Sequence, residues 1–315
     1  MSKVGVIVLN WNGREDTSQC LLSLQELTSP VEVYLVDNGS TDGSLELFKK
    51  DFPHFRLIEN GFNLGYAGGN NVGIELALKE GCEFIFILNN DTVVDVGIIE
   101  AFLESFKRES VGILGARIYR MDDPKRLDHI GGLWNGRKMD FDYVGYKAKD
   151  EDIPGELDYV CGAAIMVRRE VFEKVGLFDP RFFLFWEEAD FCMRARKAGF
   201  LVEHCRSAKV WHKISASFTG GKPHAAYFLW RNRLLWIERN FSGRKKFIYF
   251  ARLLGGKYPV FFFSKQLRRL QALFQKDPTR NRERIIRLNA AIVGMQDYLT
   301  KRFYSGRSKK FMNCD

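Results

Sequence analysis

Short strand-like runs alternate with helical patterns over the first 120 residues of this 315-residue chain. The predicted strands are rich in β-branched and aromatic residues and cover Val4–Leu9, Val31–Val36, Phe55–Ile58 and Phe84–Leu88. The helices predicted between them cover Arg14–Leu27, Leu45–Phe52 and Asn70–Leu78. This alternation predicts an α/β fold, with a mostly parallel central sheet that is flanked by helices on both faces.

Polar side chains follow three of these strands. They are Asn10 and Asn12 after the first strand, Asp37 and Asn38 after the second, and Asn89, Asn90 and Asp91 after the fourth. Ligands of parallel α/β sheets bind outside the carboxyl ends of the strands. We therefore expect these amides and carboxylates to share one rim of the sheet and to form a binding site there.

Two of these groups indicate what the ligand could be. Asp91, with amides beside it, offers oxygen ligands for a divalent cation, which would offset the charge of a nucleotide diphosphate. An ordinary turn explains Asn89–Asp91 equally well, since Asn and Asp are favoured in turns. Asp37 could accept the imide N–H of uracil or thymine, whereas Ser40 and Asp42 are better explained as caps of the next helix.

A Gly- and Asn-rich stretch at residues 60–71 lies between the third strand and the third helix, and it includes Asn63 and Gly65. Glycine lets backbone N–H groups approach phosphate or ribose closely, so we expect this stretch to line the ligand. It is not a dinucleotide-binding fingerprint, because it follows the third strand and its glycine spacing differs. The chain also has no GxxxxGK[ST] phosphate loop.

Three acids, Glu187, Glu188 and Asp190, open a predicted helix and directly follow a cluster of aromatic residues. The helix dipole alone explains acids in a first helical turn. The aromatic surroundings also predict a partly desolvated cleft, in which the pKa of a carboxylate rises and the group can act as a general base. His212 ends a further apolar strand, although a lone histidine is more often structural than functional.

The net charge of +9 favours anionic partners such as nucleotide diphosphates or acidic lipids. The basic residues concentrate between Arg231 and Lys310, where the chain is predicted to be helical and is rich in aromatic residues. Such a segment can lie on an anionic membrane, or it can pack on its own core or on a second subunit of an oligomer. We expect no nucleic-acid binding, because no recognition motif is present.

No targeting or membrane-spanning segment is predicted. The apolar stretch Phe247–Phe263 is broken by Arg252, Lys257 and Pro259, and the N-terminal apolar run is too short for a secretory signal. The six cysteines form no CxxC pair, which favours free thiols in a reducing cytosol over disulfides. We therefore expect a cytoplasmic protein, attached peripherally to the inner face of the membrane if its basic segment binds lipid.

Taken in order, these segments resemble a family 2 glycosyltransferase with the GT-A fold, and within that family the bacterial rhamnosyltransferase-like group. The motifs that carry the resemblance are VLNWN at 8–12, VDNGSTD at 36–42, NLGYAGGN at 63–70, LNND at 88–91, EEADFCMR at 187–194, WH at 211–212 and RNR at 231–233. The resemblance spans about residues 3–240. Each motif alone is weak, but the ordered series is specific.

The resemblance implies a GT-A catalytic domain at residues 1–222, with a nucleotide-sugar half at about 1–120 and an acceptor half at about 121–222. A basic helical region follows at residues 223–315. The activity implied is inverting transfer of a sugar from a dTDP- or UDP-sugar, with dTDP-rhamnose the best match. The acceptor implied is a hydroxyl of a glycan or lipid-linked glycan in cell-surface polysaccharide synthesis.

The resemblance also implies a pocket for the nucleotide sugar. Its residues would be Asn10, Asn12, Asp37, Asn38, Asn63, Gly65, Asn89 and Asn90. Within it, Asp37 would read the pyrimidine base, while Asn63 and Gly65 would lie near the nucleotide.

The catalytic groups follow from the same resemblance. Asn89–Asp91 resembles the family's DxD element, so that Asp91 would bind Mg²⁺ or Mn²⁺, and His212 would contact the metal or the diphosphate. Glu188 matches the general base, and Asp190 is the alternative base. The chain has Asn89 and Glu188 at positions where the family usually has Asp.

Two other functions remain open from the sequence. A nucleotidyltransferase would also bind nucleotide and metal on an α/β sheet, but it would place a Gly-rich loop with Arg and Lys after the first strand, where this chain has Asn10–Gly13. A non-catalytic binding module would keep the fold without the chemistry, and the departures at Asn89 and Glu188 are consistent with it.

Overall fold

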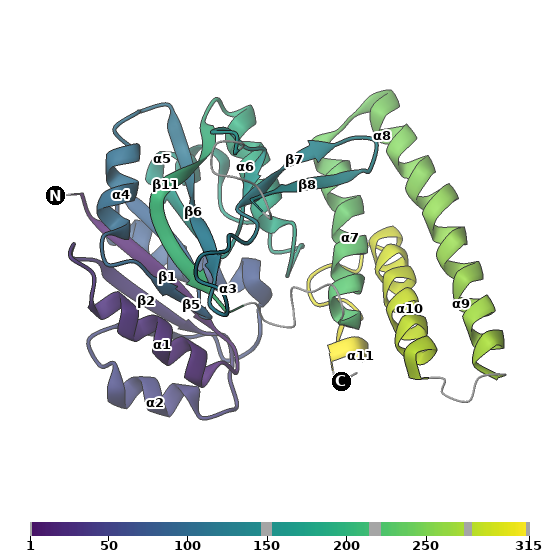
Figure 1. Cartoon of the computed structure of the whole chain (residues 1–315), viewed down its shortest axis with the longest axis horizontal. Helices are drawn as coiled ribbons and strands as arrows, with labels where there is room; N and C mark the ends of the chain where they lie inside the picture. The colour runs from purple at the N-terminus through teal and green to yellow at the C-terminus, as the bar shows by residue number, and fades with distance from the viewer. Residues whose placement is uncertain (1, 146–152, 214–221, 274–278, 313–315) are drawn as a thin grey trace. The chain divides into compact units, whose positions relative to one another are not determined.

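The computed structural model describes residues 2–145, 153–213, 222–273 and 279–312 (Figure 1). The chain divides into two compact units, which we call the first unit (residues 1–180 and 187–213) and the second unit (residues 181–186 and 214–315). The short segment 181–186 therefore belongs with the C-terminal helices, although both of its neighbours in sequence belong to the first unit.

An eight-stranded mixed sheet forms the centre of the first unit. In order across the sheet its strands are β3 (Arg56–Glu59), β2 (Glu32–Asp37), β1 (Val4–Asn10), β4 (Phe84–Asn89), β10 (Ala164–Arg168), β6 (Val111–Arg120), β11 (Leu201–His212) and β5 (Thr92–Val94). The first four strands are parallel, and β10 runs antiparallel to both of its neighbours. The predicted α/β fold is confirmed, and antiparallel pairs are confined to the second half of the sheet.

The helices of the first unit pack on this sheet. They are α1 (Arg14–Gln25), α2 (Ser44–Asp51), α3 (Gly65–Lys79), α4 (Ile98–Ser105), α5 (Arg169–Val175) and α6 (Glu187–Lys197). Side chains alternate between the faces of β1, so that Val6 and Val8 join the main apolar core with Leu21 and Phe102. Ile7 points to the opposite face, which α3 covers.

Helix α3 begins at Gly65 and not at Asn70, so the predicted Gly-rich loop is largely helical. The glycines allow the helix to approach the sheet closely. A methyl group on Gly69 would lie 2.6 Å from Leu9 Cδ1, and one on Gly73 would lie 2.8 Å from Ile7 Cγ2. The glycines within the helix therefore serve packing, which corrects their expected role as a ligand cradle.

A small three-stranded sheet follows β6 in the sequence. Its strands, in spatial order, are β8 (Asp140–Val144), β7 (Gly131–Asn135) and β9 (Tyr159–Val160). Strands β7 and β8 pair antiparallel and form a hairpin.

The second unit is helical. Its elements are α7 (Pro223–Asn240), α8 (Gly243–Phe250), the π-helix η2 (Ala251–Lys257), α9 (Tyr258–Leu273), α10 (Thr279–Leu299) and α11 (Lys309–Met312). Helix α10 packs between α7 and α9 (Figure 1). Over the described ranges, no helix combines the length and the hydropathy that crossing a bilayer requires.

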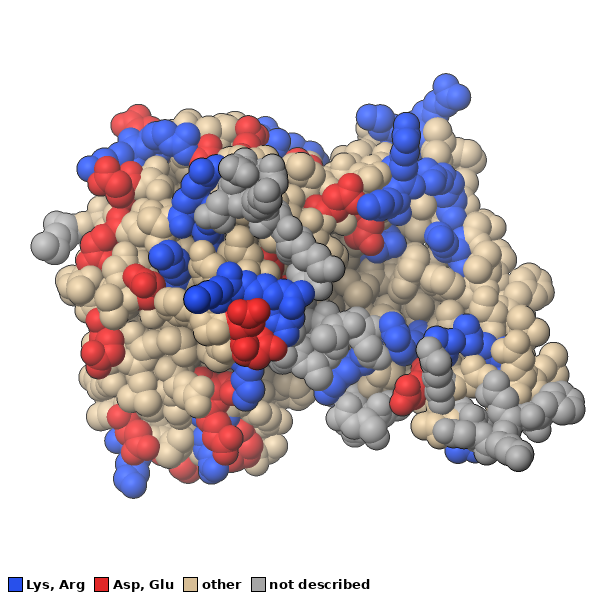
Figure 2. Space-filling view, in the orientation of Figure 1, with Lys and Arg blue, Asp and Glu red and all other residues tan. Residues whose placement is uncertain are grey.

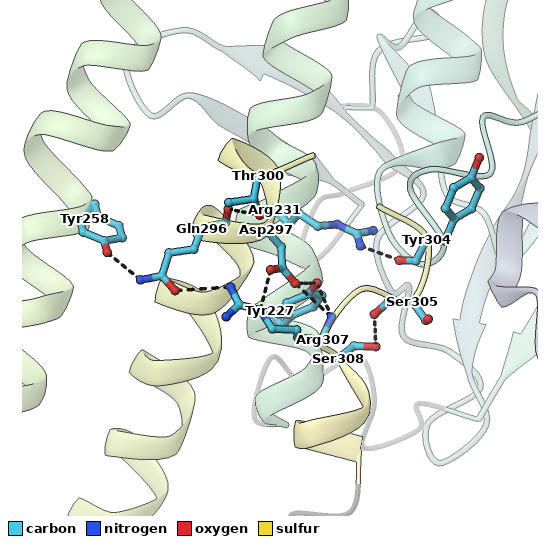
Figure 3. A network of polar contacts seen from close by, with 10 residues as sticks. All are labelled: Tyr227, Arg231, Tyr258, Gln296, Asp297, Thr300, Tyr304, Ser305, Arg307 and Ser308. Atoms are coloured by element: carbon cyan, nitrogen blue, oxygen red, sulfur yellow. Dashed lines mark hydrogen bonds and ion pairs between the residues drawn. The ribbon is translucent and has the colours of Figure 1, made fainter. Parts of the chain in front are cut away.

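A buried polar network joins α7, α10 and the segment before α11 (Figure 3). Asp297 is fully buried and accepts hydrogen bonds from Tyr227 Oη at 2.5 Å and from Arg307 Nε at 2.6 Å. The backbone N–H of Arg307 donates to the same carboxylate at 3.0 Å. A buried charge of this kind requires its partners, so the network fixes the C-terminal segment on the helices.

The cysteines of the described ranges support the prediction of free thiols. Cys20, Cys82, Cys161, Cys192 and Cys205 are buried and unpaired by disulfides, and Cys314 lies outside the described residues. Burial raises the pKa of Cys20 to about 12, so this thiol stays protonated at neutral pH.

Candidate active site

A chain of hydrogen bonds links the ends of β1, β2 and β4. Asn10 Nδ2 donates to Asp37 Oδ2 and to Ser40 Oγ, both at 2.9 Å. Asn10 Oδ1 accepts from Thr17 Oγ1 at 2.8 Å, and Thr17 Oγ1 accepts from Asn90 Nδ2 at 2.7 Å. The polar residues predicted to share one rim of the sheet therefore meet there, and Thr17 of α1 connects them.

The turn after β1 is shaped by close contacts. Asn12 adopts a left-handed φ of 51°, which Asn tolerates better than most residues, and its Oδ1 accepts from Thr41 N at 2.8 Å. A methyl group on Gly13 would lie 2.5 Å from Asn90 Nδ2, so a larger residue there would displace the Asn90 side chain. A hollow of about 270 Å³ opens beside this turn, lined by Asn12, Gly13, Arg14, Glu15, Asp16, Asp42 and Lys213.

Asp37 is buried and engaged by its own loop. Its Oδ1 accepts from the backbone N–H groups of Gly39 at 3.1 Å and Ser40 at 3.0 Å, and its Oδ2 accepts from Asn10. A carboxylate has about four acceptor positions, so about one remains for a ligand N–H group. Asp37 thus holds the loop and keeps capacity for one further donor.

Asn38 fixes the segment that precedes α3. Its Nδ2 donates to Asn63 Oδ1 at 3.1 Å and to the carbonyl of Gly65 at 3.3 Å. Its Oδ1 accepts from Leu64 N at 3.0 Å and from Asn60 Nδ2 at 3.2 Å. Asn38, Asn63 and Gly65 therefore lie together beside Asp37, with the Asn38 amide fully used in positioning this loop.

Asp91 and His212 lie side by side. Asp91 occupies the turn between β4 and β5, and His212 is the last residue of β11, where it pairs with Thr92. His212 Nε2 lies 3.0 Å from Asp91 Oδ1. Nearby, Asn89 Oδ1 is buried and accepts no hydrogen bond from any part of the chain that the structure describes.

These residues fit a cation that is shared with a bound ligand. No group of three or more His, Cys, Asp or Glu side chains in the described ranges is arranged to hold a metal by itself. Mg²⁺, however, is usually bound by one or two carboxylates together with substrate phosphates and water. Asp91 and His212 provide such a partial set, which a diphosphate would complete.

Glu188 lies in the first turn of α6, against the turn that precedes β10. A methyl group on Gly162 would lie 3.7 Å from Glu188 Cδ, and the Gly162 carbonyl accepts from Tyr66 Oη at 2.6 Å. The next residue, Ala163, accepts from Asn89 N at 2.9 Å. One turn therefore borders both Glu188 and the Asn89–Asp91 segment.

The charges of this region confirm that its acids are near one another. Burial raises the pKa of Tyr66 well above its ordinary value, and the carboxylates of Glu187, Glu188 and Asp91 raise it further. Burial and the neighbouring Glu188 carboxylate also raise the pKa of Glu187 well above the ordinary value. Burial and the Glu188 carboxylate therefore disfavour the charged form of Glu187.

Asp190 has a different environment. It is fully buried, and its Oδ2 accepts from Arg194 Nε at 2.8 Å, one turn further along α6. Arg194 also donates to the carbonyls of Val175 at 2.5 Å and Leu177 at 2.7 Å. Asp190 thus anchors α6 to the end of α5, a structural task that leaves Glu188 as the better candidate base.

Two residues of α7 hold the loop 181–186, which runs directly into Glu187. Asn232 Nδ2 lies 2.8 Å from the carbonyls of Phe182, Leu184 and Phe185. Arg231 donates to the carbonyls of Arg181 at 2.9 Å and Phe182 at 2.7 Å. We call this set of contacts the clasp.

The clasp holds a strained backbone. Phe183, Phe185 and Trp186 have φ values of 65°, 67° and 75°, which bulky residues rarely adopt. Such conformations persist when the surrounding structure imposes them, and they concentrate at functional sites. Arg231 and Asn232 are both fully buried, and Arg231 also donates to Asn232 Oδ1 at 2.9 Å and to the carbonyl of Tyr304 at 2.5 Å.

Sequence reasoning missed several of these neighbours. Thr17 lies within a correctly predicted helix, but its contact with Asn10 depends on packing that periodicity does not encode. The place of Tyr66 at the site was missed because it lies in a Gly-rich stretch. Arg231 and Asn232 belong to a motif of the resemblance, yet nothing in the motif indicates that they bind a loop about 50 residues earlier.

Comparisons with known proteins agree with this geometry. Residues 5–176 match the family described as Glycosyl transferase family 2. The chain is 29% identical, over 69% of its length and 78% of the relative's, to the N-acetylglucosaminyl-diphospho-decaprenol L-rhamnosyltransferase of Mycobacterium tuberculosis. It is 27% identical, over 66% of its length and 71% of the relative's, to the dTDP-rhamnosyl transferase RfbF of Shigella flexneri.

The fold also matches solved structures. The mannosyltransferase PcManGT from Pyrobaculum calidifontis, in complex with GDP-Man and Mn²⁺, aligns with a TM-score of 0.56 at 14% identity, over 95% of this chain and 88% of that chain. At this identity the similarity concerns the fold alone. Together with the family match, it shows that the chain belongs to glycosyltransferase family 2 and has the GT-A fold.

Proposed function

We propose that this glycosyltransferase moves rhamnose from dTDP-rhamnose to a hydroxyl of a lipid-linked glycan, with inversion at the anomeric carbon, in cell-surface polysaccharide synthesis. The names of two relatives support the sugar, and one of those names includes a polyprenyl diphosphate acceptor. The observation that carries the proposal is the turn before β10, which borders both Glu188 and the Asn89–Asp91 segment.

The strand-end network supplies the nucleotide pocket in this proposal. The remaining acceptor position of Asp37 suits the imide N–H of thymine, which uracil shares. The hollow beside Asn12 is lined by Arg14 and Lys213 together with Glu15, Asp16 and Asp42, and Lys213 pairs with Asp16 at 2.7 Å. Arg14 and Lys213 are its two candidate contacts for a diphosphate. Asn63 and Gly65 lie next to Asp37 through Asn38, which agrees with a place near the nucleotide.

Asp91 and His212 would hold Mg²⁺ or Mn²⁺ together with the donor diphosphate. A divalent cation bound there would offset negative charge on the departing diphosphate. The buried acceptor Asn89 Oδ1 lies next to Asp91 in the sequence and offers an additional oxygen on the same side of the site.

Glu188 is the general base in this mechanism. It removes the proton of the acceptor hydroxyl as that oxygen attacks the anomeric carbon from the face opposite the nucleotide. The bond between the anomeric carbon and the diphosphate oxygen breaks in the same displacement, so that dTDP leaves and the configuration inverts. The raised pKa of Glu187 is consistent with this assignment, because burial and the Glu188 carboxylate both disfavour a charge on Glu187.

The acceptor places the enzyme at a membrane. A lipid-linked glycan is embedded in a bilayer, and nucleotide sugars are cytoplasmic metabolites, so we place the enzyme at the inner face of the cell membrane as a peripheral protein.

Two measurements test the proposed function. A thermal-shift screen of nucleotide sugars, with and without Mn²⁺, is expected to give its largest metal-dependent shift with dTDP-rhamnose. Incubation with dTDP-rhamnose and a polyprenyl diphosphate glycan should then give a product whose anomeric configuration, determined by NMR, is opposite to that of the donor. Absence of a metal-dependent shift with every dTDP- and UDP-sugar would overturn the donor assignment, and retention of configuration would overturn the mechanism.

A further inference from the structure

Helix α9 carries an apolar stripe on its outward face. Val260, Phe263, Leu267 and Leu270 are spaced by three and four residues, so they lie on one side of the helix. Their exposed fractions are 55%, 69%, 57% and 58%. A surface helix of a globular protein normally buries such a stripe, whereas no described residue covers this one.

The inward face of the same helix is basic. Lys265 is buried, and its Nζ donates to Asn289 Oδ1 of α10 at 3.2 Å. One turn further on, Arg268 Nη1 donates to Asn281 Oδ1 of α10 at 3.0 Å. Helix α9 thus contacts its neighbours through cations, amides and the ring of Phe261, which lies 4.7 Å from that of Trp230 between centroids, while the stripe residues face outward. This arrangement indicates an apolar partner for the outward face.

Charge decides which partner fits. The continuous segment α8–η2–α9, residues 243–273, contains eight Lys and Arg residues and no Asp or Glu. Arg244, Lys245, Arg252 and Lys257 are exposed. Figure 2 shows blue side chains gathered at the α8 end of this segment, whereas the edge along α9 is mostly tan. A second copy of so basic a segment would repel the first, while an anionic surface would attract it.

We propose that the outward face of α9 docks on an anionic lipid bilayer. The apolar stripe enters the boundary between headgroups and acyl chains, and the exposed cations of α8 and η2 bind the anionic headgroups. Phe247 of α8, with an exposed fraction of 73%, extends the apolar contact toward these cations. This surface would be the site at which the peripheral enzyme proposed above attaches to the membrane. Its binding to lipid does not depend on which sugar the enzyme transfers.

Vesicle flotation of the full chain tests the proposal. Vesicles of phosphatidylcholine and phosphatidylglycerol in a 3:1 ratio are compared with vesicles of phosphatidylcholine alone. We expect wild type to float with the anionic vesicles and F263Q/L267Q to bind them at least about tenfold more weakly, because two buried apolar side chains are lost. The charge variant R244Q/K245Q should also bind the anionic vesicles more weakly than wild type. Raised salt should lower the affinity of wild type for these vesicles until it approaches that of the charge variant.

The matched control is Leu22→Gln, which removes an equally exposed leucine (54%) from α1 of the first unit. It should float like wild type, and all variants should keep the wild-type melting temperature and dTDP affinity. Three results would overturn the proposal: wild type that does not float with anionic vesicles, F263Q/L267Q that floats like wild type, or wild type that is a dimer in solution and becomes a monomer in F263Q/L267Q. Failure of rhamnosyl transfer with intact flotation would instead count against the proposed function alone.

Discussion

Both units of this protein have an apolar core, but they differ in how much polar and apolar surface their helices bury and expose. In the first unit the core is apolar, as in the contact between Phe86 and Phe102, whose ring centroids lie 5.4 Å apart. In the second unit Arg231, Asn232 and Asp297 are fully buried, while Phe263 is exposed. The first unit is thus an ordinary globular domain with a polar site at its strand ends. The second is held by specific polar contacts and keeps apolar surface for a partner.

The largest expected effect concerns the site of the first unit. Glu188→Gln keeps the size of the side chain but removes the base, so kcat should fall about 10²- to 10⁴-fold with little change in dTDP affinity. Glu187→Gln is the matched control, because burial and Glu188 raise the pKa of Glu187 and disfavour its charged form, so its effect should be far smaller. Steady-state kinetics measures both variants. Normal turnover in Glu188→Gln together with an inactive Glu187→Gln would contradict the assignment and would indicate that Glu187 is the base.

The next prediction tests the comparison of the units directly. Phe102→Ala removes a fully buried ring and should reduce the free energy of unfolding by about 3–5 kcal/mol. Phe263→Ala removes an exposed ring from α9 and should change that free energy by less than about 0.5 kcal/mol. Denaturant titration gives both values. Equal destabilisation by the two changes would mean that the α9 stripe is already covered in solution.

The clasp holds residues 181–186, which run directly into Glu187 in the sequence. Asn232→Leu removes contacts with three carbonyls and frees the strained loop before Glu187, so we expect kcat to fall about tenfold while dTDP affinity is kept. Asn240→Leu on the same helix removes a bond to Trp236 O without touching the loop and should leave kcat unchanged. If Asn232→Leu lowers only the melting temperature, the clasp is structural and does not position the base.

The smallest effect should appear at alkaline pH in the second unit. Burial, together with the hydrogen bond to Asp297, raises the pKa of Tyr227 from 10.0 to about 12. The folded state therefore disfavours tyrosinate, and the resulting stability is complete below pH 10 and is lost as pH rises toward 12. The Tyr227→Phe variant has no group that ionises at this position. The difference in unfolding free energy between wild type and this variant should therefore be smaller one pH unit above 10.0 than it is below 10.0. A difference that stays constant would contradict the linkage.

The sequence predicted the first unit well because its strands and their polar ends follow from local pattern. Val4–Asn10 and Phe84–Asn89 are short apolar runs, and the parallel sheet brings their ends together. The start of α3 was missed because glycine has a low helix propensity, whereas here close packing on Ile7 and Leu9 selects it. Thr17 could not be assigned, since its partners Asn10 and Asn90 follow two strands that are far apart in the sequence.

The second unit was predicted only as helical and basic. An apolar stripe in a helix indicates that one face packs against other apolar groups. It does not indicate whether these groups belong to the protein's own core or to a partner. For α9 the answer depends on Lys265 and Arg268. These side chains point toward α10, where Asn289 and Asn281 accept hydrogen bonds from them. Likewise, the clasp becomes visible only when α7 and the loop 181–186 are seen together.

The most direct test of the account is calorimetric titration of dTDP into wild type and Asp91→Asn, each with Mn²⁺ and with a chelator. The account places Asp91 and His212 beside the diphosphate, so wild type should bind dTDP at least about tenfold more tightly with Mn²⁺ than with the chelator. Asp91→Asn should bind dTDP with nearly the same affinity under both conditions. A metal effect of full size in Asp91→Asn would contradict the assignment of this rim of the sheet as the catalytic site.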